Sequence, residues 1–216
     1  LRMYPLRWDA DRGVLRVLRN LTVEVVTKGS GGVNALEPRA EGALDPQFAR
    51  LYRRGFDNYD SAGKYDMVGV EGQMLVIAHD SFMSTIQPFV EWKREKGMQV
   101  ELISSGSVGG TTAGIQGAID TRFASADGLT YVVLVGDLEQ IPTYSGTYES
   151  ADDDTRYANQ LGSDLYPDLF VSRISGSSAT DIQTQINKFI RYERDPDAAG
   201  DWYHMASGLA SSEGSP

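Results

Sequence analysis

Cysteine is absent from the 216 residues of this chain. Without it the chain can form no disulfide, no metal site built on thiolates and no thiol nucleophile of its own. Histidine is nearly absent too, since only His79 and His204 are present. A Ser-His-Asp arrangement around Ser81 and His79 is conceivable, but no G-x-S-x-G sequence of a nucleophile elbow accompanies it.

Positive charge is scarce, because 20 basic side chains stand against 30 acidic ones and the formal net charge is −10. This balance argues against a surface that binds nucleic acid or an anionic membrane, which needs clustered lysine and arginine. No stretch approaches the roughly 20 apolar residues of a membrane-spanning helix, and the first residues do not read as a signal peptide. We therefore expect no nucleic-acid partner and no membrane span, while the 41% of apolar residues can build a core.

The residues that are present divide into three predicted segments. In residues 1–26, a turn at 9–13 is followed by alternating apolar and polar positions, which predicts a β-hairpin with one buried face. Residues 27–72 contain much Gly, Ser and Ala without periodicity, which predicts a linker. Within the linker, Asp45 as N-cap and Pro46 at the first helical position predict a short helix.

Residues 73–216 are predicted to form an α/β domain. Continuous apolar runs predict strands, which we place at 74–78, 100–103, 131–135, 169–171 and 205–210. Apolar positions three and four residues apart predict helices, which we place over about 14 residues before Gly97, at 112–124 and at 181–194. The alternation predicts a mostly parallel sheet with helices on both faces, preceded by a small β-rich segment.

Ligands of open α/β sheets bind beyond the carboxyl ends of the strands, so polar residues at these positions are the first candidates for a site. His79-Asp80 follow the first predicted strand, Gly136-Asp137 follow the third, and Ser211-Ser212-Glu213 follow the last. Each of these residues could equally serve only as a cap of the next helix.

A second concentration of acidic residues lies in the segment 149–168. It contains six carboxylates: Glu149, Asp152, Asp153, Asp154, Asp164 and Asp168. Oxygen ligands at this density can hold Ca²⁺, which takes six to eight of them, although the spacing is not that of an EF-hand. The simpler interpretation, a solvated acidic loop, stays open at this point.

From Met74 to Pro216 the sequence resembles the first half of the catalytic domain of the gingipain family of cysteine peptidases, whose fold is caspase-like. The resemblance depends on the order and spacing of several short motifs. These are Phe89-Val90-Glu91-Trp92-Lys93, Leu129 to Asp137 with Ile141-Pro142, Gly162 to Asp168 with Arg173, Tyr192-Glu193-Arg194 and Ala210 to Pro216. Residues 1–26 also resemble, more loosely, the end of the propeptide of this family.

The resemblance implies the N-terminal portion of a secreted or cell-surface cysteine endopeptidase that acts on proteins or peptides. A cysteine nucleophile is served by a histidine in such enzymes, and by motif match Glu213 is the carboxylate that orients this histidine. The family's Cys and His would follow Pro216, so we expect this chain alone to be inactive and the downstream half of the catalytic domain to be its partner. The resemblance also implies structural Ca²⁺, with Asp137, the Leu161 carbonyl, Asp164, the Tyr166 carbonyl and Asp168 as ligands. The alternative is a non-catalytic, calcium-binding α/β module used for surface binding or secretion.

Overall fold

The structure is a computed structural model that describes residues 5–20, 22–24, 26, 45–56, 59, 72–125, 128–146, 150–162 and 166–208. The chain divides into two compact units, residues 1–35 and 36–216, which are described separately below. The predicted ligand or catalytic positions Asp164 and Glu213 lie outside the described residues. Among the described residues, no helix is long and apolar enough to cross a membrane.

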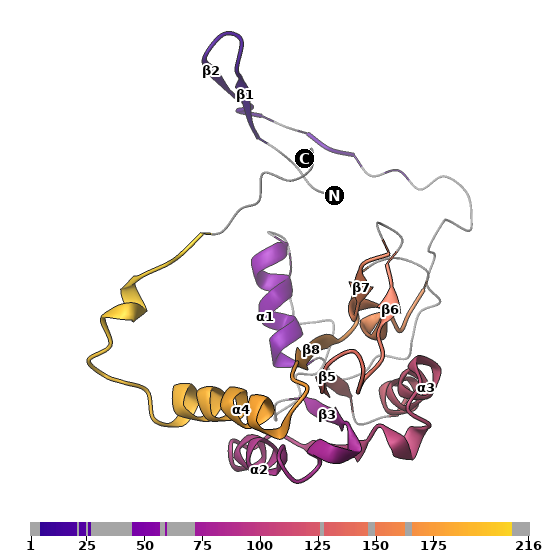
Figure 1. Cartoon of the computed structure of the whole chain (residues 1–216). Coiled ribbons are helices and arrows are strands. Elements are labelled where there is room, and N and C mark those ends of the chain that lie inside the picture. Colours follow the sequence, from indigo (N-terminus) through magenta and orange to yellow (C-terminus); the bar gives the residue numbers. More distant parts are fainter. Residues whose placement is uncertain are drawn as a thin grey trace. The chain divides into compact units, whose positions relative to one another are not determined.

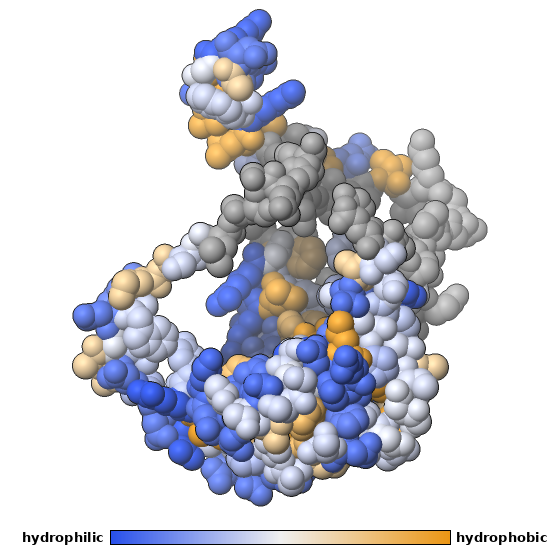
Figure 2. All heavy atoms as spheres, viewed as in Figure 1, coloured by the Kyte–Doolittle hydropathy of each residue, from blue (hydrophilic) through white to orange (hydrophobic). Residues whose placement is uncertain are grey.

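The first unit contains an antiparallel hairpin of β1 (Leu6–Asp9) and β2 (Val14–Val17), as the sequence predicts. Its register places Leu6 opposite Val17 and Trp8 opposite Leu15, so these four apolar residues share one face. The predicted burial of this face is wrong for the described residues, because each of the four side chains is more than half exposed. Figure 2 shows hydrophobic residues at the surface of the hairpin. Burial of such a face requires a further packing layer, which a two-stranded hairpin does not contain.

A four-stranded parallel sheet is the centre of the second unit (Figure 1). Its strands are β3 (Gln73–Ala78), β4 (Val100–Ser104), β5 (Leu129–Val135) and β8 (Phe170–Ile174), in the order β4-β3-β5-β8. The two central strands are buried on both faces, which explains why their sequences are continuous apolar runs. The strand order reverses at β3, so the carboxyl ends of β3, β5 and β8 form the edge at which the sequence predicts a site.

Helices cover both faces of this sheet, as predicted. On one face, β3, β5 and β8 contribute Met74, Val76, Ala78, Val133, Val135 and Ile174 to a core completed by α2 (Gln87–Glu95) and α4 (Ala179–Arg194). On the other face, Leu75, Ile77, Val132 and Leu134 pack with Ile115 and Ile119 of α3 (Thr112–Phe123). The short helix α1 (Pro46–Gly55) begins at its predicted cap, where the Asp45 carboxylate accepts a hydrogen bond from the Gln47 amide at 2.7 Å.

Short elements connect these layers. After β3 comes the 3₁₀ turn η1 (Asp80–Phe82), and after β4 comes η2 (Gly106–Val108). The segment between β5 and β8 contains the two-residue strands β6 (Tyr144–Ser145) and β7 (Asp152–Asp153), followed by η3 (Thr155–Ala158). These last elements bring the acidic segment to the β8 side of the sheet, where η3 contacts β8.

Two details of the predicted element order are wrong. The helix after β3 has nine residues, because the chain first makes η1 and turns, and Pro88 then lies in the first helical turn, where proline is favoured. The predicted strand at 205–210 is not found in its described part, residues 205–208, which follow the 3₁₀ helix η4 (Asp201–His204). Met205 is 69% exposed, and an apolar run becomes a strand only where a neighbouring strand satisfies its backbone groups.

Candidate functional site

The candidate site lies at the carboxyl end of β5, where the chain turns sharply. Gly136 has a φ of +135°, a conformation that other residues rarely adopt, and a Cβ there would lie 2.9 Å from Cβ of Gln140. Glycine is therefore required for the turn that carries Asp137. The Ile141 amide donates to the Asp137 carbonyl at 2.8 Å and closes the turn.

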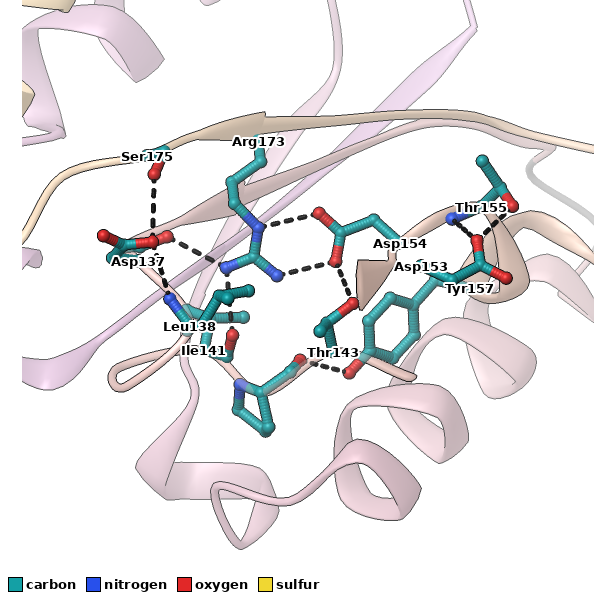
Figure 3. A network of polar contacts seen from close by, with 12 residues as sticks. Asp137, Leu138, Ile141, Thr143, Asp153, Asp154, Thr155, Tyr157, Arg173 and Ser175 are labelled. Atoms are coloured by element: carbon teal, nitrogen blue, oxygen red, sulfur yellow. Dashed lines mark hydrogen bonds and ion pairs between the residues drawn. The ribbon is translucent and has the colours of Figure 1, made fainter. Parts of the chain in front are cut away.

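Asp137 is held by its own turn and by the end of β8. Its backbone N–H donates to the Gly176 carbonyl at 3.1 Å, and its Oδ1 accepts from the Leu138 amide at 2.9 Å and from the Ser175 hydroxyl at 3.2 Å (Figure 3). The structure thus places the carboxylate between the carboxyl ends of two neighbouring strands. This is the position that the sequence predicts for it.

Arg173 of β8 connects this turn to the acidic segment. Its Nε and Nη2 donate to the two carboxylate oxygens of Asp154, each at 2.7 Å, which is the bidentate geometry that guanidinium and carboxylate favour. Its Nη1 donates to the carbonyls of Gly136 and Ile141, both at 2.9 Å. Figure 3 shows the guanidinium between Asp154 on one side and the Asp137 turn on the other.

The groups around this ion pair have shifted pKa values. Burial alone would raise the pKa of Asp154, but hydrogen bonds from Arg173 and Thr143 and the charge of Arg173 outweigh it, so the pKa lies below its ordinary value. Burial, assisted by nearby Tyr144 and Asp154, raises the pKa of Tyr157 to about 12. Tyr157 therefore stays neutral and donates its hydroxyl to the Pro142 carbonyl at 2.7 Å. Both shifts favour a network that persists at neutral pH.

The proposed calcium ligands are only partly brought together by the described residues. Asp168 Oδ2 accepts hydrogen bonds from the amides of Gln160 and Leu161, both at 2.9 Å, so the Asp168 carboxylate and the Leu161 backbone are adjacent. Tyr166 is 78% exposed, and the Asp137 carboxylate contacts Ser175 at the end of β8. In the described part of the chain, no three His, Cys, Asp or Glu side chains lie close enough to hold a metal ion. Of the three proposed carboxylates, that part contains Asp137 and Asp168, whose oxygen atoms are of the kind that Ca²⁺ prefers.

The residues that follow β3 form contacts of their own. His79 Nδ1 lies 2.7 Å from Ser81 Oγ, while the Asp80 carboxylate accepts a hydrogen bond from the Ser104 hydroxyl. The contacts of the described residues therefore pair His79 with Ser81 but do not assemble a Ser-His-Asp triad there. This arrangement is typical of side chains that cap a 3₁₀ turn, and His79 is the N-cap of η1.

The Arg173–Asp154 pair is the feature of this edge that the sequence does not predict. The sequence indicates Arg173 only as a motif residue and Asp154 only as a member of an acidic segment. The sequence nevertheless contains a signal, since an arginine in a strand that packs into the core needs a partner for its charge. The sequence does not show which of several nearby carboxylates is that partner.

Comparison with protein families shows one match over most of the second unit. The sequence model of peptidase family C25 matches residues 70–215. Gingipain R1 of Porphyromonas gingivalis is 31% identical over 217 residues, which is 98% of this chain and 21% of that protein. Lys-gingipain of the same organism is 26% identical over 200 residues, which is 90% of this chain and 12% of that protein. The chain thus spans 21% or less of the length of these two relatives.

Solved structures confirm the predicted fold class. The complex of the pro- and mature domains of Porphyromonas gingivalis RgpB matches with a TM-score of 0.54 at 32% identity, covering 57% of this chain and 30% of that chain. The crystal structure of the Arg-specific cysteine proteinase gingipain R matches with a TM-score of 0.53, covering 57% of this chain and 29% of that chain. The parallel sheet with helices on both faces is therefore the architecture that these structures share with this chain.

Proposed function

Because the chain belongs to peptidase family C25, a family of gingipain-like cysteine peptidases, we propose that it is the N-terminal portion of an endopeptidase that cleaves proteins or peptides. The observation that carries the proposal is the family match over residues 70–215, which includes the whole parallel sheet and its carboxyl edge. The sheet supplies a rigid support for residues at the carboxyl ends of its strands, which is where enzymes of this architecture act. We propose that the protein is secreted or lies at the cell surface. We also propose that residues 1–26 are the end of its propeptide.

We propose that the nucleophile of this reaction is a cysteine of the protein outside these 216 residues, which contain no cysteine. A histidine, also outside these residues, would remove the thiol proton and later protonate the leaving amine. Glu213 would accept a hydrogen bond from the other ring nitrogen of this histidine, thereby fixing its tautomer and stabilising the imidazolium form. In this proposal, the contribution of the present chain is the carboxylate and the sheet edge, while the downstream half contributes the proton transfer and the attack.

We propose that Ca²⁺ supports this edge, with Asp137, Asp164 and Asp168 and the carbonyls of Leu161 and Tyr166 as ligands. When bound, the ion would neutralise carboxylates that repel one another at short range. The support for this proposal is that Asp168 is fixed next to Leu161 by two amide hydrogen bonds and that all five donors are oxygens. Asp137 is fixed independently by Ser175 and Leu138.

The proposal is tested by comparing the 216-residue chain with the complete natural polypeptide in a peptide hydrolysis assay. We expect no hydrolysis by the chain alone and thiol-dependent hydrolysis by the complete protein. Glu213→Ala in the complete protein should lower kcat by about 10²-fold or more, because the histidine loses its orientation. Glu91→Ala, a change on the exposed face of α2, is the matched control and should leave kcat unchanged. A complete protein that hydrolyses no peptide and yet binds calcium would instead support the non-catalytic module.

A further inference from the structure

Arg173 is a nearly buried cation in a strand that otherwise presents apolar and small side chains. Its side chain is 11% exposed. Four of its five N–H groups donate to oxygens of three segments: the end of β5, the turn that follows it, and the Asp154 carboxylate next to β7. We propose that Arg173 is a positioning residue of the peptidase, which holds the Asp137 turn and the acidic segment in the geometry that the carboxyl edge needs for catalysis. This inference rests on the proposed function.

The first argument concerns the turn. Gly136 and Ile141 are the first and last residues of the turn that carries Asp137, and the Arg173 Nη1 binds the carbonyls of both. A single nitrogen therefore joins the two ends of this turn to β8. Because Asp137 is bonded covalently to Gly136, a displacement of Gly136 moves Asp137 away from Ser175, whose hydroxyl contacts it at 3.2 Å.

The second argument concerns the acidic segment. Asp154 directly follows β7 and receives three side-chain hydrogen bonds, two from Arg173 and one from the Thr143 hydroxyl at 2.9 Å. Without the guanidinium, a partly buried carboxylate would lose its counter-charge, which is costly enough to displace the segment toward water. Arg173 thus joins β8 directly to Asp154, which follows β7, and through Asp154 to Thr143, which precedes β6.

Lysine cannot replace arginine in this arrangement. An ammonium has three donors on one atom and cannot bind both Asp154 oxygens in a fork while also reaching two carbonyls on the opposite side. Arg173→Lys therefore retains the charge and most of the side-chain volume but loses the geometry. This variant distinguishes a requirement for positioning from a requirement for charge.

The chain contains a matched control pair at the other end of the sheet. Arg122 binds Glu101 in the same forked manner, with Nε and Nη2 contacts of 2.6 and 2.5 Å, and its Nη1 also donates to a carbonyl, that of Ala118. Glu101 lies near the amino end of β4, far along the strand from the proposed catalytic edge. Arg122→Lys therefore makes the same chemical change where no catalytic group is proposed.

The test compares Arg173→Lys with Arg122→Lys in the complete protein. We expect Arg173→Lys to lower kcat by about 10- to 100-fold with KM changed by less than about 3-fold, and Arg122→Lys to change neither. Amide exchange of Asp137 and Ile141, whose N–H groups donate to Gly176 and Asp137, should accelerate only in Arg173→Lys. Equal kcat values and equal exchange in the two variants would overturn the inference, even if both variants were less stable.

The exchange measurement separates this inference from the proposed function. If the complete wild-type protein cleaves no peptide, the proposed function fails, but selective exchange at Asp137 and Ile141 still decides whether Arg173 holds the turn. If the wild-type protein is active and Arg173→Lys retains its kcat, the inference alone fails. Asp154→Asn, which keeps the shape of the partner and removes its charge, serves as a second variant should Arg173→Lys not fold.

Discussion

At the scale of single residues, Glu193 shows how a motif noted in the sequence becomes a contact. Its carboxylate accepts hydrogen bonds from Trp92 Nε1 at 2.9 Å, Lys93 Nζ at 2.6 Å and Lys96 Nζ at 2.9 Å. The donors lie at the end of α2, and Glu193 lies in the last turn of α4. Two motifs about 100 residues apart in the chain therefore join the two helices that cover one face of the sheet.

The pKa of Glu193 predicts how stability depends on pH. Burial opposes its ionisation, but hydrogen bonds from Lys93, Lys96 and Trp92 outweigh burial and lower the pKa from 4.5 to about 2. A carboxylate whose pKa is lower in the folded chain than in the unfolded chain stabilises the folded state. This stabilisation is fully present at a pH above the pKa of the unfolded chain, and it is lost as the pH falls through the pKa of the folded chain. We expect the unfolding free energy to decrease by about 1–2 kcal/mol between pH 4.5 and 2 on this account, after allowance for solvent screening.

Glu193→Gln provides the measurement for this prediction. Urea unfolding at pH 7 should show a loss of about 1–2 kcal/mol, because the glutamine lacks the charge that two lysines bind. The pH dependence below 4.5 should become flatter than in the wild type. A variant with unchanged pH dependence would show that other carboxylates account for the loss of stability in acid.

The sequence predicts the location of a single residue correctly where its position relative to a strand determines that location. Asp137 is placed correctly because it follows the most apolar strand, and its place at the edge follows from strand direction. The Asp154–Arg173 pairing could not be predicted, because it depends on how the segment between β5 and β8 folds back. Asp152, Asp153 and Asp154 are identical side chains at consecutive positions, and only the tertiary structure shows that Asp154 is the partner of Arg173.

At the scale of elements, replacing a glycine by alanine should have opposite effects on stability in the turn after β5 and in helix α3. Gly136→Ala should destabilise the chain by about 2 kcal/mol or more, because a φ of +135° and a contact of 2.9 Å to Gln140 oppose the added methyl group. Gly117→Ala should stabilise it by about 0.5–1 kcal/mol, because Gly117 lies inside α3 and a Cβ there meets no atom within 4 Å.

Thermal or denaturant unfolding of the two variants checks this pair of predictions. The Gly117→Ala variant is the control for the general effect of removing a glycine from the unfolded chain. Gly136→Ala with a stability equal to or above that of the wild type would contradict the conformation assigned to the end of β5.

Element prediction was most accurate for strongly periodic or continuously apolar segments. The four parallel strands and helices α1, α3 and α4 were predicted within a few residues, because burial on defined faces imposes their patterns. The helix predicted over about 14 residues before Gly97 is shorter in the structure, because the chain first forms η1 and a turn, from which Phe82 and Ile86 are buried. The run at 205–210 resembled a strand in composition alone, and composition does not supply a pairing partner.

At the scale of the whole molecule, the proposed calcium site predicts a ligand-dependent stability. A ligand that binds only the folded state stabilises it, so adding 5 mM EDTA to the complete protein should lower Tm, and excess Ca²⁺ should restore it. We expect a change of about 4 °C or more, and Asp168→Asn should reduce it. Asp201→Asn, which alters an exposed acid in η4, is the control. A Tm that EDTA leaves unchanged would contradict the calcium proposal.

We propose that the 216 residues supply the sheet and the orienting carboxylate of a cysteine peptidase whose nucleophile lies outside them. The proposal is tested by treating the complete natural polypeptide with iodoacetamide, following peptide hydrolysis, and locating the label by mass spectrometry. We expect activity to be lost in step with alkylation of one cysteine outside these 216 residues. Hydrolysis that survives complete alkylation, or hydrolysis by the cysteine-free chain itself, would contradict it.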